Sequence, residues 1–318
     1  MPEWTTIIAG ALVAILGMVI VALLRFWRHP VAFMARQERR RLARLGFKKS
    51  ILDTSSGKLV FWEAGSGPIL VFLHGAGDQA GTWSRVLPQL GKGRRCLLID
   101  FAGHGESEPR QGPLTMGLEL ASLEALLEAR VAADDVVVLI GNSMGAWVAM
   151  LYAHRHPERV ALLIAVNGGA LNWIRKEVSL MPANRDEARH LLLLTRGPSS
   201  PSVPGFVLDD IVRESHRGPI GRLSQNPGDL RQYFMEDRLS EITVPVEIVW
   251  GEDDRLLGSD YAKRLADAIP KARLTLLPHC GHIPQRHCPS AFTATVAEIL
   301  KSRIPAAGTQ ASSANEAT

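Results

Sequence analysis

The stretch IGNSMGAWV, residues 140–148, places Ser143 between two glycines, directly after the apolar run VVVLI at 136–140. A short apolar run predicts a buried strand, and the following GAWVAMLYAHRH predicts a helix. The pattern Gly-x-Ser-x-Gly between a strand and a helix is typical of a strained turn that exposes a serine hydroxyl. The hydroxyl then lies beside a helix N-terminus, whose free N–H groups favour anions. The sequence therefore predicts a nucleophilic serine at this turn.

Apolar runs alternate with helical segments on both sides of this turn. Besides 136–140, the predicted strands are KLVFWEAG (58–65), PILVFLHG (68–75), RCLLIDFAG (95–103), RVALLIAVN (159–167), VPVEIVWG (244–251) and ARLTLLP (272–278). Continuous apolar strands separated by helices indicate parallel strands buried on both faces. The predicted fold is α/β, with a mostly parallel central sheet flanked by helices.

The alternation stops between residues 168 and 240, where polar helical pieces surround the Pro/Gly/Ser stretch at 196–205. An insertion here would lie over the C-terminal ends of the strands, so a helical cap is predicted at about 170–240. Aromatic residues of the insertion are expected either to line an acyl pocket or to form the cap's own core; they are Trp173, Phe206, Tyr233 and Phe234. The small, polar tail at 303–318 is expected to be disordered.

A serine hydroxyl is a poor nucleophile without a base, and two residues near strand ends are candidates to activate it. His282 follows the last predicted strand, and Asp254 follows the strand before it. The chain order serine, aspartate, histidine is the order expected for this kind of turn. The C-terminal ends of parallel strands share one edge of the sheet, so the three side chains are expected to meet there.

A second loop can supply backbone N–H groups to a developing oxyanion. HGAG, residues 74–77, follows the strand ILVFL, and its glycines let the backbone approach a substrate. The backbone N–H groups of this loop and of Met144 are the candidate donors. Each such donor typically stabilises the transition state by ~3–4 kcal/mol.

These motifs resemble the α/β-hydrolase fold superfamily over residues 50–302. The matching stretches are HGAG (74–77), DFAGHGES (100–107), GNSMG (141–145), WGEDDRL (250–256) and GHIP (281–284). The resemblance implies that Ser143 is the nucleophile, His282 the base and Asp254 the acid, with Ala76 and Met144 as the oxyanion hole. The family's Gly-x-x-Asp spacing selects Asp254 over the adjacent Asp253.

Within that superfamily the chain looks like membrane-anchored monoacylglycerol lipases and related bacterial esterases. GNSMG also occurs in C–C bond hydrolases that act on ring-cleavage products. Haloalkane dehalogenases and epoxide hydrolases share the fold but need an aspartate nucleophile, and position 143 is serine. Asp100, His104 and His74 are expected to brace loops and not to react.

The N-terminal run IIAGALVAILGMVIVALL, residues 7–24, carries no charge. As a helix it spans about 27 Å, close to the thickness of a bilayer core, and Trp4 and Trp27 bracket it as in an aromatic belt. A cleaved signal peptide would need positive charge before the run and a small-residue cleavage site after it, whereas MPEWTT and RFWRHP flank this one. Residues 1–28 are therefore predicted to be an uncleaved anchor; a buried core helix is the alternative.

The segment after the anchor, residues 29–49, is strongly basic. Residues 25–49 hold nine Lys/Arg and one acid, Glu38, whereas residues 50–318 hold 27 basic and 30 acidic residues, a net of −3. The basic character is thus local, and no nucleic-acid partner is expected. The bias places the main domain in the cytoplasm by the positive-inside rule. The segment itself either binds anionic lipid or is a solvated linker helix.

The cysteines and histidines near the C-terminus invite two further interpretations. An odd count of three cysteines, Cys96, Cys280 and Cys288, suits a reducing compartment better than a disulfide framework. The cluster of His279, Cys280, His282, His287 and Cys288 lacks a second set of ligands at zinc spacing, so no metal is expected. No cofactor is expected either.

The sequence predicts a membrane-anchored serine hydrolase that cleaves carboxylic esters of small, apolar molecules through an acyl-enzyme, with lipid esters such as monoacylglycerols as one class. Other acyl hydrolysis or C–C cleavage by the same residues is an alternative. A non-catalytic, membrane-tethered interaction protein is another.

Overall fold

The computed structural model describes residues 2–172, 178–197 and 200–304. Eight strands form one sheet in the order β1-β2-β4-β3-β5-β6-β7-β8, in which β2 is antiparallel to both of its neighbours and the other pairs are parallel. The strands are β1 Lys48–Thr54, β2 Gly57–Ala64, β3 Ile69–Leu73, β4 Arg95–Ile99, β5 Val137–Asn142, β6 Val160–Val166, β7 Val246–Gly251 and β8 Arg273–Leu277.

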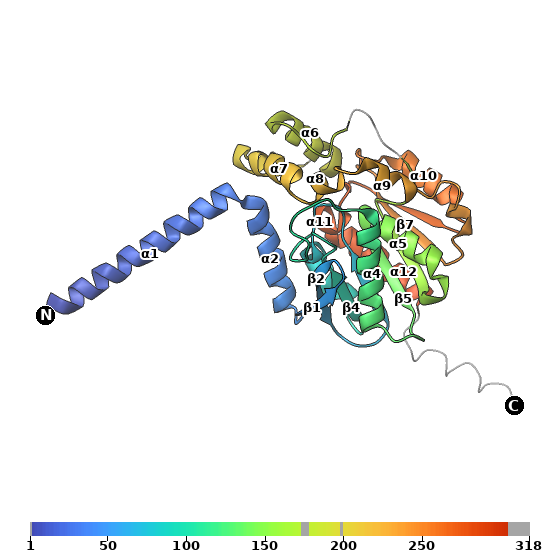
Figure 1. The fold of residues 1–318 in the computed structure, drawn as a ribbon, viewed down its shortest axis with the longest axis horizontal. Coiled ribbons are helices and arrows are strands. Elements are labelled where there is room, and N and C mark those ends of the chain that lie inside the picture. Colours follow the sequence, from blue (N-terminus) through green and yellow to red (C-terminus); the bar gives the residue numbers. More distant parts are fainter. Residues whose placement is uncertain (1, 173–177, 198–199, 305–318) are drawn as a thin grey trace.

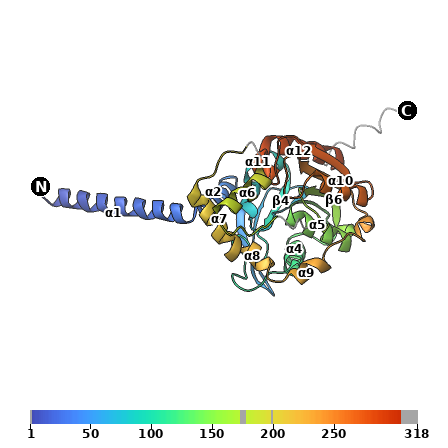
Figure 2. The ribbon, with the colours of Figure 1, turned by 90° about the horizontal axis from the view of Figure 1, so that it is seen from above.

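Helices cover both faces of the sheet. One face carries α4 (Met116–Arg130), α5 (Met144–Arg155) and α10 (Ser259–Ala268), and the other carries η1 (Ala80–Arg85), α3 (Leu87–Leu90), α11 (Pro284–His287) and α12 (Pro289–Arg303). Figure 2 shows α4 and α5 on the side opposite to α11 and α12.

The two cores arise from the alternation of side chains along buried strands. In β3, Val71 packs with α4 and α5 on one face, whereas Leu70 and Phe72 pack with η1 and α12 on the other. All three side chains are 0% exposed, which explains why the strand reads as a continuous apolar run. The α/β fold predicted from that pattern is confirmed.

The insertion between β6 and β7 forms the cap, which lies above the sheet in Figure 1. Its elements are α6 Arg185–Arg196, α7 Gly205–Arg217, α8 Pro219–Leu223, α9 Pro227–Gln232 and η3 Leu239–Glu241. Trp173 lies outside the described residues. Phe206, which was expected in the pocket or in the cap core, instead packs against Phe26 and Trp27, at ring-centroid distances of 5.8 and 6.4 Å.

Two helices precede the sheet. The first, α1 (Pro2–Arg28), projects away from the rest of the molecule in Figures 1 and 2, and its apolar stretch Ile7–Arg28 is 0% buried. This helix is a candidate membrane span by length and composition. The second, α2 (Pro30–Arg44), turns back and packs against η1 and α7, burying Leu42 completely.

The predicted boundary at residue 50 falls inside an element, because β1 begins at Lys48. Helix α2 packs along the hydrolase fold through one side, while its basic residues Arg36, Arg40, Arg41 and Arg44 are exposed. The division of the chain into an anchor, a basic segment and a hydrolase domain stays a prediction. The expected disordered tail lies outside the described residues from 305 onward.

The interpretation of the cysteines as unpaired is wrong. Cys280 and Cys288 form a disulfide, and their Cα atoms lie 5.7 Å apart. The chain leaving β8 turns back through α11 to the start of α12, so two residues eight positions apart face each other. Cys96 is the odd cysteine, and it is a buried free thiol in the core.

Candidate active site

Ser143 lies at a cramped turn between β5 and α5. Its backbone has φ 54° and ψ −118°, a strained conformation for a residue with a side chain. Its N–H donates to the Val166 carbonyl at 2.9 Å, which fixes the turn against β6. A Cβ at Gly145 would lie 2.3 Å from the Leu73 carbonyl oxygen, and one at Gly168 would lie 2.3 Å from the Ser143 carbonyl oxygen. Only glycine fits at these positions, so the local sequence enforces the turn.

Asp254 and His282 form a buried pair at the ends of β7 and β8. His282 Nδ1 lies 2.8 Å from Asp254 Oδ2, and the side chains are 7% and 0% exposed. Asp254 Oδ2 also accepts from Asn167 Nδ2 at 2.8 Å, and Oδ1 accepts from the backbone N–H groups of Leu256 and Leu257. Both oxygens of the carboxylate therefore have fixed partners.

This set of donors keeps Asp254 ionised. Burial by itself would raise the pKa of Asp254, but the adjacent His282, the Asn167 amide and the Leu257 N–H outweigh it, and the pKa lies below its ordinary value. The carboxylate faces Nδ1 of the imidazole, which leaves Nε2 for another partner. A pair of this kind can orient the ring and stabilise an imidazolium.

The residue before Ser143 ties the serine turn to the histidine loop. Asn142 Nδ2 donates to the His282 carbonyl at 3.0 Å and to the Val166 carbonyl at 3.1 Å. Asp253, the neighbour of Asp254, packs instead against Gly197 of the cap. The structure thus brings Asp254 to His282 and places the backbone of His282 beside the serine turn.

A cavity of about 490 Å³ opens at Ser143 beneath the cap. Ala76 and Met144, the predicted oxyanion residues, line it with the serine. Its apolar wall comes from the core and the cap: Met116, Trp147, Leu171, Val178, Leu180, Met181, Ile220, Leu223, Leu230, Phe234 and Leu257. Among the described residues that line it, Arg231 is the one charged side chain. Such a lining suits an apolar group placed next to the serine hydroxyl.

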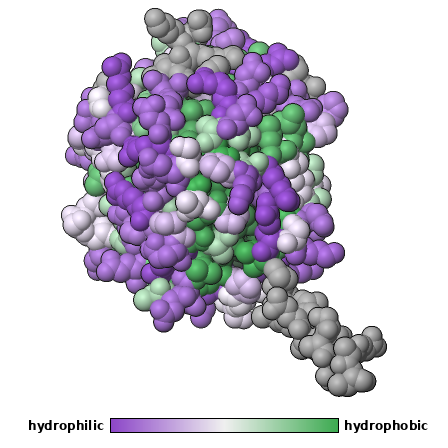
Figure 3. All heavy atoms as spheres, turned by 90° about the vertical axis from the view of Figure 1, so that its right-hand side faces the viewer, coloured by the Kyte–Doolittle hydropathy of each residue, from purple (hydrophilic) through white to green (hydrophobic). Residues whose placement is uncertain are grey.

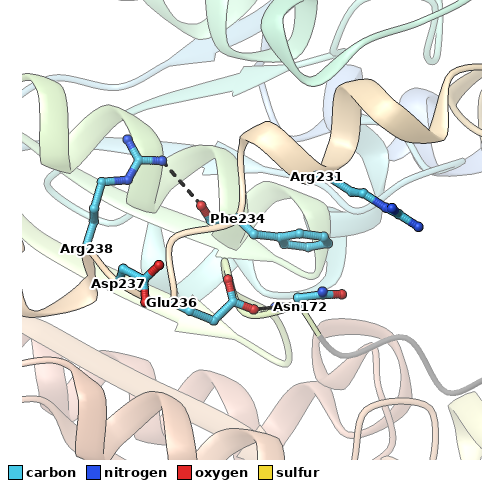
Figure 4. A pocket seen from close by; sticks show the side chains of 6 residues that line it. All are labelled: Asn172, Arg231, Phe234, Glu236, Asp237 and Arg238. Atoms are coloured by element: carbon cyan, nitrogen blue, oxygen red, sulfur yellow. Dashed lines mark hydrogen bonds between the residues drawn. The ribbon is translucent and has the colours of Figure 1, made fainter.

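A second, polar cavity of about 450 Å³ shares lining residues with this one. Figure 4 shows Arg231 and Phe234, which line both cavities, beside the acidic Glu236. Phe234 also stacks on Trp147, with ring centroids 4.7 Å apart. Of the three aromatic residues of the insertion that the structure describes, Phe206, Tyr233 and Phe234, the last lines the apolar cavity.

Other buried polar groups brace the loops around the site. Asp100 Oδ1 accepts from the Ala80 N–H at 2.7 Å, and Oδ2 accepts from the Glu106 N–H at 2.9 Å. His74 Nε2 accepts from the Phe101 N–H at 3.1 Å, and burial lowers the pKa of His74 to about 4, so this ring is neutral. These contacts fit the bracing roles expected from the sequence.

Sequence reasoning missed Asn167 and Asn142 as supports of the site. Both are polar residues at the end of an apolar strand, where a side chain reaches the C-terminal edge of the sheet. The expected absence of a metal concerned the cluster near residue 282; there the disulfide occupies both thiols, which removes them as ligands.

A different group, His29, Asp210 and Glu214, has ligand atoms within 4.8 Å of one another. Arg213 donates to Asp210 and approaches His29 Nδ1 at 3.4 Å. The guanidinium of Arg213, which is always charged, thus already occupies the space between these side chains.

The eight-stranded sheet, the strained serine turn and the buried aspartate–histidine pair define the class of α/β hydrolases. The profile of the alpha/beta hydrolase family matches residues 70–296, and the chain belongs to that family. Family membership supports a hydrolase that acts on a small molecule.

Known proteins of several activities resemble this chain. A 2-hydroxy-6-oxononadienedioate/2-hydroxy-6-oxononatrienedioate hydrolase of Cupriavidus pinatubonensis is 28% identical over 255 residues, which cover 73% of this chain and 86% of that protein. The crystal structure of a membrane phospholipase A, described as a bacterial virulence factor, superposes with a TM-score of 0.74 at 21% identity, covering 94% of this chain and 100% of that one. A putative lipase from Acinetobacter baumannii gives a TM-score of 0.68 at 20% identity, covering 85% and 95%. At these identities the two structures share the fold.

Proposed function

We propose that this protein is a membrane-anchored serine hydrolase that cleaves carboxylic esters with an apolar acyl group. Ser143 attacks the carbonyl carbon while His282 takes the hydroxyl proton, and Asp254 stabilises the imidazolium. The backbone N–H groups of Ala76 and Met144 stabilise the oxyanion. His282 then protonates the leaving alkoxide, and water deprotonated by the same ring releases the acid. The observation that carries this proposal is the strained Ser143 opening into an apolar cavity beside the Asp254–His282 pair.

Esters of lipids are the proposed substrates. The cavity offers mainly hydrocarbon to the acyl group, at roughly 0.8 kcal/mol for each buried methylene. The uncharged run of α1, residues 7–24, would hold the enzyme where such molecules are concentrated. A membrane phospholipase A shares the fold over 94% of this chain, which fits the same substrate class.

Fluorophosphonate labelling tests the proposal directly. The purified full-length chain in detergent should form a covalent adduct at Ser143 and hydrolyse p-nitrophenyl esters. Ser143→Ala should abolish labelling and lower turnover by ~10⁶, with the fold retained. Wild-type protein that is well folded but neither labels nor turns over would support a non-catalytic, membrane-tethered interaction protein instead.

C–C bond hydrolysis is the second candidate, because the relative from Cupriavidus pinatubonensis, at 28% identity, is a 2-hydroxy-6-oxononadienedioate hydrolase. Such a substrate carries carboxylates, and Arg231 is the one charged residue among the described residues that line the cavity. The rate at which dienoate absorbance is lost, compared with the rates of hydrolysis of p-nitrophenyl esters of graded chain length, separates C–C bond hydrolysis from ester hydrolysis. Preference for the dienoate over every ester would replace the ester proposal.

The side of the membrane that the domain occupies also remains a proposal. The basic residues after the anchor favour the cytoplasm, whereas the Cys280–Cys288 disulfide favours an oxidising compartment, because disulfides seldom persist in the cytosol. We propose that the domain lies on the oxidising side. The charge rule describes a statistical bias, whereas a persisting disulfide requires an oxidant.

A further inference from the structure

Glu38, the lone acid among the basic residues that follow the anchor, points into the fold and not into solvent. Its Oε2 accepts from Gln79 Nε2 at 2.8 Å and from Arg286 Nη2 at 2.6 Å. Gln79 lies just after the loop that contains Ala76, and Arg286 lies four residues after His282. One carboxylate of α2 therefore contacts the flanks of both active-site loops.

Arg286 closes the link between the two loops. Its Nη2 also donates to Asp78 Oδ1 at 2.8 Å, and the same oxygen accepts from the Gln79 N–H at 2.8 Å. Three segments that are far apart in the sequence thus meet at one guanidinium: helix α2, the 74–79 loop and helix α11. The side chains of Glu38, Asp78 and Arg286 are 22%, 10% and 29% exposed, so the cluster is largely shielded from water.

The residues around the cluster of Glu38, Asp78 and Arg286 are closely packed. A Cβ at Gly81 would lie 2.8 Å from the Glu38 Cβ, and Gln79 Oε1 caps the Gly81 N–H at 2.8 Å. The Asp78 N–H donates to the Gly75 carbonyl at 3.2 Å, which closes the turn around Ala76. Movement of Asp78 or Gln79 would therefore move the Ala76 amide.

We propose that Glu38 is a positioning residue of the active site. Through Gln79 and Arg286 it fixes the Ala76 loop relative to the His282 loop, so that the helix next to the membrane anchor belongs to the catalytic framework. The inference rests on the proposed function, in which the Ala76 N–H donates to the oxyanion. A misplaced oxyanion donor weakens binding of the transition state more than binding of the ester, so the loss is in kcat and not in KM.

The test compares Glu38→Gln with a matched control, Glu106→Gln, in the full-length chain in detergent. Gln keeps the shape of Glu38 but removes the charge that faces Arg286. Glu106 also pairs with basic residues beside it, Arg39 at 3.9 Å and Lys49 at 3.1 Å, but does not touch the Ala76 loop. We expect Glu38→Gln to lower kcat for a p-nitrophenyl ester ~10-fold, below the 10²–10³ for complete loss of a donor, with KM within about twofold. Glu106→Gln should leave both constants unchanged.

A double-mutant cycle asks whether Glu38 acts through Gln79. If it does, Gln79→Leu combined with Glu38→Gln should lower kcat no more than the larger single effect, because both variants release the same loop. If Glu38→Gln fails to fold, Arg286→Lys, which keeps the charge but loses the fork geometry, takes its place with the same expected fall in kcat.

Three results would overturn the inference: kcat of Glu38→Gln within twofold of wild type, a rise in KM alone, or an equal loss in Glu106→Gln. In each of these the wild type is active and labels at Ser143, so the proposed function stands. A wild type that neither labels nor turns over removes both.

Discussion

Two pairs that each join a carboxylate to a nitrogen-bearing side chain involve the chain that follows β8, and they differ in origin and chemistry. Asp254 and His282, 2.8 Å apart, come from the ends of adjacent core strands. Glu38 and Arg286, 2.6 Å apart, join a helix outside the sheet to the short helix after the histidine. The first pair contains an imidazole, whose ring nitrogens can donate or accept a hydrogen bond, whereas the guanidinium of the second only donates and is always charged.

Under the proposed function, one loop serves proton transfer and rigid positioning together. A pair that moves a proton must contain a titratable partner shielded from water, and the partners of Asp254 leave it no freedom to shift. A pair that only fixes distance gains from a permanent charge with several donors, and Arg286 uses its donors on two acids. His282 and Arg286 both lie in the chain segment that the Cys280–Cys288 disulfide closes into a loop.

The largest expected effect breaks the first pair. Asp254→Asn should lower kcat by ~10⁴, because the amide cannot hold His282 in the required tautomer or stabilise its protonated form. Initial rates with a p-nitrophenyl ester measure the loss. The matched control is Asp253→Asn, which alters the neighbouring acid that does not contact His282 and should keep kcat within about twofold. A larger loss of kcat in Asp253→Asn than in Asp254→Asn would show that Asp253, and not Asp254, is the partner of His282.

The next effect separates catalysis from acyl selection. Leu230→Trp should narrow the apolar cavity and lower kcat/KM for long-chain esters relative to short ones by roughly 10-fold, since about two methylenes lose their room at ~0.8 kcal/mol each. Rates across a series of chain lengths give the ratio. Leu193→Trp, at an exposed leucine of α6 outside the cavity, should leave the ratio unchanged. An unchanged ratio in Leu230→Trp would place the acyl group elsewhere.

The disulfide that closes the loop around His282 and Arg286 can be removed by replacing Cys280 and Cys288 with serine. A chain cross-link of this length stabilises by about 2–3 kcal/mol, so the melting temperature should fall by ~5–10 °C. Cys96→Ser, at the buried free thiol, is the control without a cross-link.

The same cysteines report the orientation of the domain. In intact cells they should resist alkylation until a reductant is added, and a C-terminal reporter should behave as extracytoplasmic. Free thiols together with a cytoplasmic reporter would restore the orientation given by the charge rule.

The smallest effect concerns a third pair that is not ionic. His104 and Glu119 are fully buried, with Nδ1 and Oε1 3.6 Å apart. Burial raises the pKa of Glu119 well above its ordinary value, and burial together with the nearby His74 lowers the pKa of His104 to about 3. The imidazole of His104 is therefore neutral near pH 7, and burial disfavours the charged form of Glu119.

Replacing Glu119 tests this assignment through the pH dependence of stability. A carboxyl whose folded pKa is raised contributes stability below its unfolded pKa, and this contribution is lost as pH rises toward the folded pKa. The melting temperature of Glu119→Gln minus that of the wild type should therefore rise by a few degrees as the pH is raised from about 5 to 8. Glu128→Gln, an exposed acid on the same helix, should follow the wild type. A gain that falls with rising pH would contradict a protonated Glu119.

Local patterns in the sequence predicted the fold and gathered the candidate site. The buried strands were recognisable as apolar runs, and Ser143, Asp254 and His282 each follow such a run within a few residues. Local patterns did not predict the state of the cysteines, on which the proposed orientation of the domain depends. Pairing of Cys280 with Cys288 depends on the path of the chain through α11, which no local pattern encodes.

The sequence by itself determined the parallel sheet, the turn at Ser143 and the apolar N-terminal helix, because each depends on side chains close together in the chain. Tertiary structure alone decided that Glu38 meets Arg286, 248 positions away, and that α2 packs against η1 and α7. Their contact arises only after the strands have fixed where both helices lie. A charge on the surface of a helix carries no sign of the partner that the fold will bring to it.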